Sequence, residues 1–392
     1  MPLNLIVLMS YFAIEPESIT GGIGYRFVGL YGSLAKALLN HSPESKIFFY
    51  SNADRCLRLI TRKKTSKSRS SMLKAVLGAI STTLKSRSYL VAVVAYPYAV
   101  PSVPTVWEYI LSLLALKVFG LGRIRVVADD IDPPVEGAFA FSEAGPSTAT
   151  ILYWRILDML TLKLASFTIT LSESFKQYIA KIYRIKGEKI LIVPSGSLVR
   201  YISYVPPKYG SLTILYSGSA MKVKDINKLF LAVNRAREKG LKLSLVLTGA
   251  KLMNIPSSEW VVHKTVDNWR SYVKNCLELS DVGVIPYPRR LFWDYQLLTK
   301  LFDYMAAGKP IISTNLKETG NIIRMFNCGL VARDWEEFEL HLERLYHDRE
   351  FAKKLGENGR RATEKYFNYE LLSEALLISL LKHLKMSNAG EG

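Results

Sequence analysis

The segment Leu298-Thr-Lys-Leu-Phe-Asp-Tyr-Met-Ala-Ala-Gly-Lys-Pro-Ile-Ile-Ser-Thr314 predicts a short helix followed by a buried strand. Gly308 stands where a helix C-cap is expected, and Pro310 prevents the helix from continuing. Two isoleucines then begin an apolar run that is typical of a strand in a parallel sheet. The start of the helix presents unpaired N–H groups and a partial positive charge beside Lys300. We therefore expect this helix to bind a diphosphate.

Predicted strands and helices alternate along the whole chain. In the first half we expect strands at 3–9, 46–50, 90–96, 125–128, 167–171 and 190–193, and helices at 26–40, 106–118, 151–164 and 173–183. After Pro206 and Pro207 we expect strands at 213–216, 243–247, 260–263, 282–285, 311–313 and 329–331. The helices expected between and after them are 225–238, 269–277, 298–307 and 335–345, with two more beyond Arg349. This order predicts an α/β fold with two doubly wound domains, each a parallel sheet covered by helices.

The 298–314 segment resembles the nucleotide-sugar helix of retaining GT-B glycosyltransferases of family 4 (glycosyl transferases group 1), which often read Pro-x-Lys-Leu-Phe-Glu-Tyr-Met-Ala-x-Gly-Lys-Pro here. The resemblance implies two Rossmann-like domains that face a central cleft. It implies an acceptor-side domain at 1–197, a nucleotide-sugar domain at 198–368, and a last helix at 369–392 that returns to the first domain. A helix–turn–strand unit from another kind of doubly wound domain is the alternative.

The same resemblance implies roles for individual residues of this segment. Leu298, Thr299 and Lys300 would bind the nucleotide sugar, and Lys300 would also act in catalysis. The family carries two glutamates here, of which the first touches the donor sugar and the second bonds the ribose hydroxyls. Tyr295 falls at the first position and Asp303 at the second. Half of the acidic pair is therefore missing.

The segment 216–225 follows a predicted strand and resembles the Gly-Arg-(x)4-Lys-Gly phosphate loop of the family. Gly218 and Lys224 match this loop, and Ser219 stands where arginine is usual. Lys224 is thus a second catalytic candidate, which would stabilise the leaving diphosphate. Lys222 or Lys300 would supply the other positive charge. A solvent-facing lysine is the alternative, although the helix dipole disfavours a cation at a helix start.

Glycines supply further candidates for the donor site. Gly22 and Gly24 lie in the first strand-to-helix connection and resemble the Gly-Gly loop that covers the sugar diphosphate, where glycine allows close approach. A plain tight turn is the alternative. Gly249 and Val266 lie where the family encloses the nucleobase, and these are weak signals.

Three carboxylates follow the strand predicted at 125–128, namely Asp129, Asp130 and Asp132. Similar turns in the family face the acceptor, so Asp130 and Asp132 are candidates to orient the acceptor hydroxyl or the donor sugar. Turn chemistry around Asp-Pro explains the same residues without function. Because there is no histidine between His41 and His263, no catalytic histidine is expected.

The chain is strongly basic, with a net charge of +18 and a pI near 9.6. Ten lysines and arginines and no acidic residue lie between Arg55 and Arg87, and residues 72–85 carry an apolar helical stripe. This segment predicts peripheral attachment to an anionic, cytoplasmic membrane face. The candidates are Arg62, Lys63, Lys64, Lys67, Arg69 and Lys74. A disordered, solvated loop is the alternative, and nucleic acid is disfavoured because stacking aromatic residues are almost missing there.

Other sequence features limit the remaining possibilities. The longest apolar stretch, residues 103–121, is interrupted by proline and charges, so we expect no membrane crossing. We also expect no signal peptide at the N-terminus. Three scattered cysteines favour a reducing compartment and give no zinc-binding spacing.

Together these features predict a retaining hexosyltransferase that uses a UDP- or GDP-sugar and a lipid-linked or glycan acceptor. No cofactor and no metal are expected, because lysines can replace the ion beside the diphosphate. Two other functions stay open. The first is a non-catalytic GT-B subunit at the membrane, which would explain Tyr295 and Ser219. The second is a nucleotide-sugar epimerase of the same architecture, for which the basic segment would have no purpose.

Overall fold

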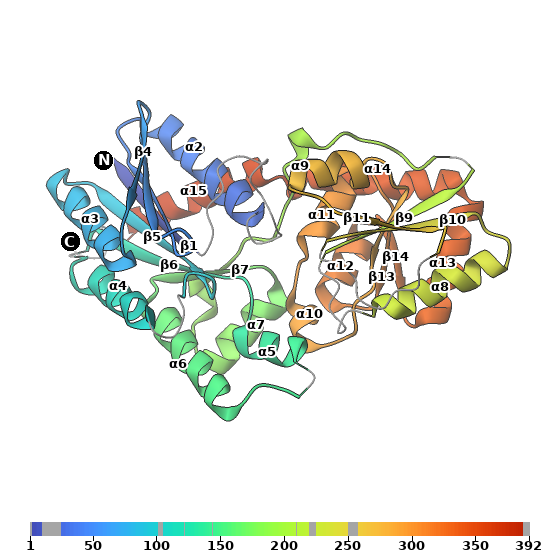
Figure 1. Ribbon diagram of the computed structural model, residues 1–392. Coiled ribbons are helices and arrows are strands. Elements are labelled where there is room, and N and C mark those ends of the chain that lie inside the picture. Colours follow the sequence, from blue (N-terminus) through green and yellow to red (C-terminus); the bar gives the residue numbers. More distant parts are fainter. Residues whose placement is uncertain are drawn as a thin grey trace.

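The computed structural model describes residues 2–9, 25–100, 105–120, 122–142, 144–208, 210–218, 225–249 and 258–386. Over these residues the chain forms two lobes, each built around one sheet with helices on its faces (Figure 1). The predicted fold class of two α/β domains is therefore confirmed.

The first sheet has eight strands in the order β4-β3-β2-β1-β5-β6-β7-β8. They are β1 (Leu3–Met9), β2 (Ile47–Ser51), β3 (Cys56–Ile60), β4 (Thr65–Arg69), β5 (Tyr89–Tyr96), β6 (Ile124–Asp130), β7 (Phe167–Thr170) and β8 (Ile190–Ile192). The accompanying helices are η2 (Phe27–Gly32), α2 (Ser33–His41), α3 (Met72–Lys85), α4 (Val106–Val118), α5 (Pro134–Phe141), α6 (Thr148–Leu164) and α7 (Glu173–Tyr183). Strands β1, β2 and β5–β8 pair in parallel, as the alternating pattern predicts.

The basic segment is where the first domain differs from expectation. Residues 56–69 form a hairpin, β3–β4, that pairs antiparallel with β2 and extends the sheet. Every residue of β4 is exposed, and charged side chains on an edge strand discourage pairing with other chains. The alternative of a disordered loop is therefore wrong.

Helix α3 confirms the helix predicted at 72–85, but its apolar side faces inward. Met72, Val76 and Ile80 are buried in a core cluster with residues of β1, β2 and β5. Apart from the exposed Leu77, the apolar stripe of α3 is consequently not available to a membrane. Lys74 lies on the opposite, exposed side of the helix.

The second sheet has six parallel strands in the order β11-β10-β9-β12-β13-β14. They are β9 (Leu212–Ser217), β10 (Leu243–Thr248), β11 (Val261–Lys264), β12 (Val282–Ile285), β13 (Ile311–Thr314) and β14 (Gly329–Ala332). The helices are α8 (Ile226–Glu238), α9 (Trp269–Tyr272), η6 (Val273–Leu277), α10 (Leu291–Tyr295), α11 (Thr299–Ala306), α12 (Lys317–Phe326), α13 (Trp335–His347) and α14 (Arg349–Tyr366). Helices α10 and α12 are absent from the sequence prediction.

Helix α11 ends as the motif predicts. The amide of Gly308 donates to Met305 O over 3.0 Å and that of Lys309 donates to Tyr304 O over 2.9 Å, which is the Schellman arrangement. Gly308 has a φ of +73°, and a Cβ there would lie 2.3 Å from the ring of Tyr204. Glycine is therefore required both by the backbone and by the close packing.

The two lobes are joined near residues 194–202 and again at 366–369. Ser197 exchanges backbone hydrogen bonds with Phe367 and Tyr369, so the two connections lie side by side. Helix α15 (Tyr369–Met386) then returns to the first lobe and packs against α2 (Figure 1). Within it, Ser373 Oγ donates to Leu30 O over 2.8 Å.

Candidate active site

A cavity of about 250 Å³ lies between the lobes and is lined from both sides. The second lobe contributes the start of α11, with Leu298 and Thr299, together with Tyr287 at the end of β12. The first lobe contributes Asp132 and Tyr98 among others. No side chain caps α11, so its first turn directs backbone N–H groups toward this region.

Lys300 lies in the first turn of α11, between two aromatic rings. Its Nζ is 4.5 Å from the ring centroid of Tyr216 and 4.9 Å from that of Tyr287. It also donates to Tyr287 Oη over 2.7 Å. The aromatic faces and the hydroxyl hold the ammonium group close to the helix start, so the positive charges of both are concentrated in one place.

Gly218 and Gly249 lie at the ends of the neighbouring strands β9 and β10, and both pack closely. A Cβ on Gly218 would lie 2.7 Å from Lys300 Nζ, and one on Gly249 would lie 2.2 Å from Gly218 O. Both residues have positive φ, +137° and +126°. The structure thus brings Gly218, Gly249 and Lys300 together, as expected for a common site.

Asp303, the candidate ribose ligand, is buried and has three hydrogen-bond donors in the structure. Its Oδ1 accepts hydrogen bonds from Tyr25 Oη and Ser197 Oγ, each 2.9 Å away. Its Oδ2 accepts from Trp269 Nε1 over 3.1 Å, and the residue is 4% exposed. Burial raises the pKa of Asp303 to about 6, against the lowering effect of these donors. In this conformation the carboxylate joins the two lobes and the connection between them.

Tyr295 is also part of the contact between the lobes and does not line the cavity. Its ring stacks on Phe175 with centroids 5.9 Å apart, and its carbonyl oxygen accepts from Ser172 Oγ over 2.8 Å. The neighbouring Asp294 is buried and accepts from the amide of Lys317, at the start of α12. Neither residue replaces the missing first glutamate in this arrangement.

The three aspartates at the end of β6 and just after it have three different environments. Asp129 is fully buried and accepts two hydrogen bonds from Arg26, at 2.9 and 3.2 Å, so Arg26 holds the first lobe together. Asp130 is buried away from the cavity, and burial together with the nearby Asp158 raises its pKa well above the usual value. The interpretation of Asp130 as a group facing the acceptor is therefore wrong.

Asp132, in contrast, lines the cavity. Its Oδ2 accepts a hydrogen bond from Tyr98 Oη. Burial raises the pKa of Asp132 to about 7, although a hydrogen bond from Gln296 and the charge of Arg26 lower it. This carboxyl group can consequently change its protonation state near neutral pH, which suits a group that orients a hydroxyl or receives its proton.

Several predicted site residues cannot be located in this way. Gly22, Gly24, Ser219 and Lys224 lie outside the described residues. Val266 is described, half-buried against the core of the second lobe. The described residues contain no group of three or more His, Cys, Asp or Glu side chains that could hold a metal ion. Metal independence stays a prediction.

The membrane candidates of the basic segment are all exposed. Arg62, Lys63 and Lys64 form the turn of the hairpin, and Lys67 and Arg69 lie on β4. Lys67 Nζ is 3.4 Å from Asp54, which also pairs with Arg58. In the described residues no helix is long and apolar enough to cross a bilayer.

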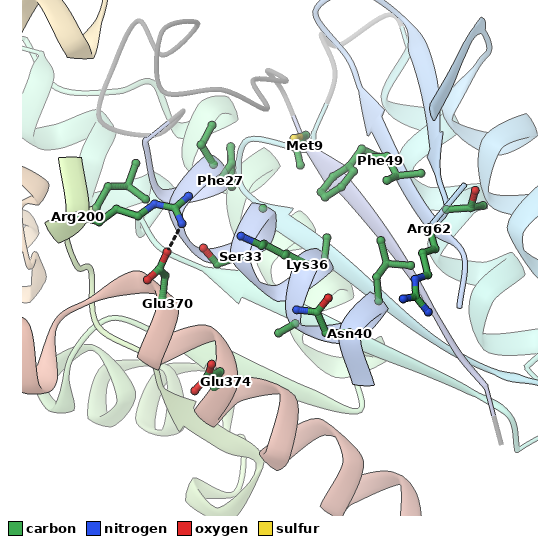
Figure 2. A pocket seen from close by; sticks show the side chains of 18 of the residues that line it. Met9, Phe27, Ser33, Lys36, Asn40, Phe49, Arg62, Arg200, Glu370 and Glu374 are labelled. Atoms are coloured by element: carbon green, nitrogen blue, oxygen red, sulfur yellow. Dashed lines mark ion pairs between the residues drawn. The ribbon is translucent and has the colours of Figure 1, made fainter. Parts of the chain in front are cut away.

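A second, larger hollow of about 740 Å³ runs along α2 on the first lobe (Figure 2). Apolar side chains such as Met9 and Phe49 line it beside Lys36 and Arg62. At one end Arg200 pairs with Glu370 of α15 over 2.6 Å, the ion pair drawn in Figure 2. This groove does not include the start of α11.

Sequence reasoning missed the residues that surround the predicted ones. Tyr25, Ser197 and Trp269 hold Asp303, and Tyr287 holds Lys300. Tyr287 could have been found, because it lies two residues after the end of β12 and side chains at the carboxyl ends of parallel strands meet at one edge. The donors to Asp303 carry no such signal, since each comes from a separate element.

Comparisons with known proteins agree with this geometry. Residues 211–348 match the family model for glycosyl transferases group 1. A stretch of 62 residues, 16% of the chain and 16% of the relative, is 38% identical to a Bacillus subtilis (strain 168) protein whose name is that of a teichuronic acid biosynthesis glycosyltransferase. The capsular polysaccharide biosynthesis glycosyltransferase CapM of Staphylococcus aureus is 24% identical over 254 residues, 58% of the chain and 63% of the relative. The chain thus spans less than two thirds of the length of these curated relatives.

Among solved structures, the sucrose-phosphate synthase of Thermosynechococcus elongatus superposes with a TM-score of 0.68. The match covers 98% of this chain and 99% of that one at 16% identity, so it concerns the fold. That fold is the GT-B architecture predicted from the sequence. Residues 211–348 are therefore similar to glycosyl transferases group 1, within a molecule of the GT-B fold.

Proposed function

We propose that this protein is a retaining glycosyltransferase that moves a hexose from a UDP- or GDP-sugar to a lipid-linked or glycan acceptor. The observation that carries the proposal is the position of Lys300 in the uncapped first turn of α11, where it donates to Tyr287, a residue that lines the cavity between the lobes. A helix N-terminus with an adjacent ammonium group suits a diphosphate. The match of residues 211–348 to the glycosyltransferase family model includes this segment and supports the proposal.

In the proposed reaction, the bond between the sugar C1 and the diphosphate oxygen breaks as the acceptor oxygen bonds to C1 on the same face. Negative charge accumulates on the leaving diphosphate, which also takes the proton of the acceptor hydroxyl. The amides of α11 and Lys300 stabilise that charge, and one such preorganised donor is typically worth about 3 kcal/mol of barrier. We propose that Lys224 adds a second charge from the loop that follows Gly218, and that no metal ion is needed.

Asp132 has the position and the chemistry to act on the acceptor. It lies across the cavity from Thr299, and its raised pKa means that it is partly protonated at neutral pH. As a carboxylate it would accept a hydrogen bond from the acceptor hydroxyl and fix its direction toward C1. Tyr98, which already donates to this carboxyl group, would hold it in place.

We also propose that the exposed cations of the hairpin attract the protein to the cytoplasmic face of an anionic membrane, which would bring it to a lipid-linked acceptor. Each lysine or arginine near such a surface contributes about 1 kcal/mol. Deleting the hairpin would expose β2, so the test is a triple Arg62→Ser, Lys63→Ser and Lys64→Ser variant in vesicle flotation. Binding to anionic vesicles equal to that of the wild type would contradict this role.

A non-catalytic subunit is the second candidate, and one observation favours it. Tyr295 and Asp303, at the two positions of the acidic pair, both take part in contacts between the lobes. Such contacts would serve a scaffold as well as an enzyme.

Hydrolysis and transfer assays with UDP-, GDP- and ADP-sugars separate these functions. We expect one donor to be consumed by the wild type, and the rate to fall by about 100-fold or more in Lys300→Ala. The rate should persist in the presence of EDTA. Loss of activity with chelator and its return with Mg²⁺ or Mn²⁺ would disprove metal independence, and equal background rates in both proteins would favour the scaffold.

A further inference from the structure

The outward side of α4 is apolar along its whole length. Trp107, Leu111, Leu114 and Val118 recur at helical spacing and are between 41% and 67% exposed. A surface helix normally turns polar residues toward water and apolar ones toward the core. The opposite side of α4 is buried in the core and is also apolar, with Tyr109, Leu113 and Leu116. Both sides of the helix are therefore apolar.

Helix α6 repeats this pattern beside α4. Leu152, Ile156 and Met159 form its exposed stripe, between 44% and 59% exposed, and the two helices are in contact. Helix α3, packed on α4, adds the exposed Leu77. In Figure 1 the three helices form one side of the first lobe, away from α2 and α15. Single exposed apolar residues are ordinary, whereas a contiguous set on packed helices marks an interaction surface.

The charges on this side have one sign. The exposed charged residues of α3, α4 and α6 are Lys74, Lys85, Lys117 and Lys163. The two acidic residues of these helices, Glu108 and Asp158, are buried. The face is therefore complementary to a surface that is apolar inside and negatively charged outside.

Three of these lysines also lie at one end of the helical layer. Lys85, Lys117 and Lys163 each occupy the last turn of their helix. These helices lead into β5, β6 and β7, which are parallel neighbours and begin at the same edge of the sheet. The helix ends, and their ammonium groups, consequently gather at that edge.

We propose that this apolar–lysine face, formed by α3, α4 and α6, docks on an anionic lipid bilayer. The stripes of α4 and α6 would enter the headgroup layer, and the lysines would reach lipid phosphates with their long side chains. This inference rests on the membrane part of the proposed function and goes beyond it. It assigns the apolar contact to α4 and α6, a role for which the sequence pattern had indicated α3.

The test is flotation of the whole protein with vesicles of equal parts phosphatidylcholine and phosphatidylglycerol, and with vesicles of phosphatidylcholine. We expect the double variant Leu114→Gln, Val118→Gln to bind the mixed vesicles about tenfold more weakly than the wild type. The control, Met325→Gln with Leu340→Gln, removes two exposed apolar residues, 72% and 58% exposed, from α12 and α13 and should bind like the wild type.

The lysines are tested in the same assay. Each of Lys85→Ala, Lys117→Ala and Lys163→Ala should weaken binding to the mixed vesicles by about fivefold, the equivalent of about 1 kcal/mol for each charge. Binding to phosphatidylcholine vesicles should not change, because the lysine contribution depends on anionic lipid.

Wild-type binding by the Leu114→Gln, Val118→Gln variant would overturn the proposal. So would a wild-type dimer in analytical ultracentrifugation that the same variant dissociates, since a second copy would then cover the face. Nucleotide-sugar hydrolysis should be unaffected by all these substitutions. If the wild type floats with the mixed vesicles but hydrolyses no nucleotide sugar, the proposed reaction is wrong. If it hydrolyses a nucleotide sugar but does not float, the docking face is wrong.

Discussion

Helix α14 of the second lobe and helix α4 of the first present opposite surfaces. The exposed residues of α14 include Lys353, Lys354, Glu364 and Lys365, charges of both signs that suit contact with water. Those of α4 are apolar with one lysine, which suits an interface. The cation that distinguishes the second lobe is Lys300, which donates to Tyr287 in the wall of the cavity. If the proposals above hold, the second lobe binds the donor and the first lobe faces the partner surface.

Removal of the Lys300 ammonium group should have the largest effect. We expect Lys300→Ala to lower kcat by about 100- to 1,000-fold, because the developing charge on the diphosphate loses its ammonium partner. The measurement is transfer at saturating donor. Lys317→Ala removes an exposed lysine from the start of α12 and serves as the control, with no change expected. An equal loss of kcat in both variants would mean that the overall positive charge, and not Lys300 in particular, supports the reaction.

Asp303→Ala should reduce stability rather than donor binding. Three buried donors, on Tyr25, Ser197 and Trp269, would lose their acceptor, which we expect to lower the free energy of unfolding by about 3 kcal/mol. Urea denaturation measures this, with the exposed Asp267→Ala as control. A variant with wild-type stability and a raised KM for the donor would instead support the role of Asp303 as a ligand of the ribose hydroxyls.

The contribution of Asp303 to the free energy of unfolding should also depend on pH. Its folded pKa of about 6 lies above the unfolded value, so its stabilising effect is complete at pH values below the unfolded pKa and is lost as the pH rises through 6. The difference in unfolding free energy between wild type and Asp303→Asn should therefore change between about pH 4 and pH 6. A constant difference over this range would contradict the raised pKa.

Asp132→Asn should alter the pH dependence of the reaction. With a pKa of about 7, the wild-type carboxyl group gains its negative charge as the pH rises through neutrality, and kcat/KM should rise with it. We expect the variant to lose this limb of the profile and about tenfold of the rate above pH 7. An unchanged profile would show that Asp132 does not act on the acceptor.

Gly218→Ala should have the smallest effect, and it tests the packing around Lys300. The added Cβ would displace the Lys300 ammonium group, which is the end of a flexible side chain. We expect a loss of about 1 kcal/mol in donor binding, measured by calorimetry. Gly210→Ala is the control, because that glycine also has a positive φ but has nothing within 4 Å of the new Cβ.

Predictions from the sequence were most accurate for features that depend on residues close together in the chain. The end of α11 follows from Gly308 and Pro310, and the parallel pairing of the predicted strands follows from the alternation of apolar runs with helices. The hairpin β3–β4 escaped prediction because its outer strand, Thr65–Arg69, has no buried side to give an alternating pattern.

The candidate site was predictable in part for the same reason. Lys300 and Thr299 belong to one local motif. In the structure Thr299 lines the cavity, and Lys300 donates to Tyr287, which also lines it. The environment of Asp303 depends on Tyr25 and Ser197, 278 and 106 residues away along the chain. Contacts of that range arise from how the lobes meet, and no local pattern contains them.

The most direct test of the central claim is a crystal structure of the protein with UDP or GDP bound. We predict that the β-phosphate accepts hydrogen bonds from the amides of Thr299 and Lys300 and lies within ion-pair distance of Lys300 Nζ. A diphosphate bound elsewhere, for example beside Lys36 and Arg62 in the groove along α2, would contradict the account.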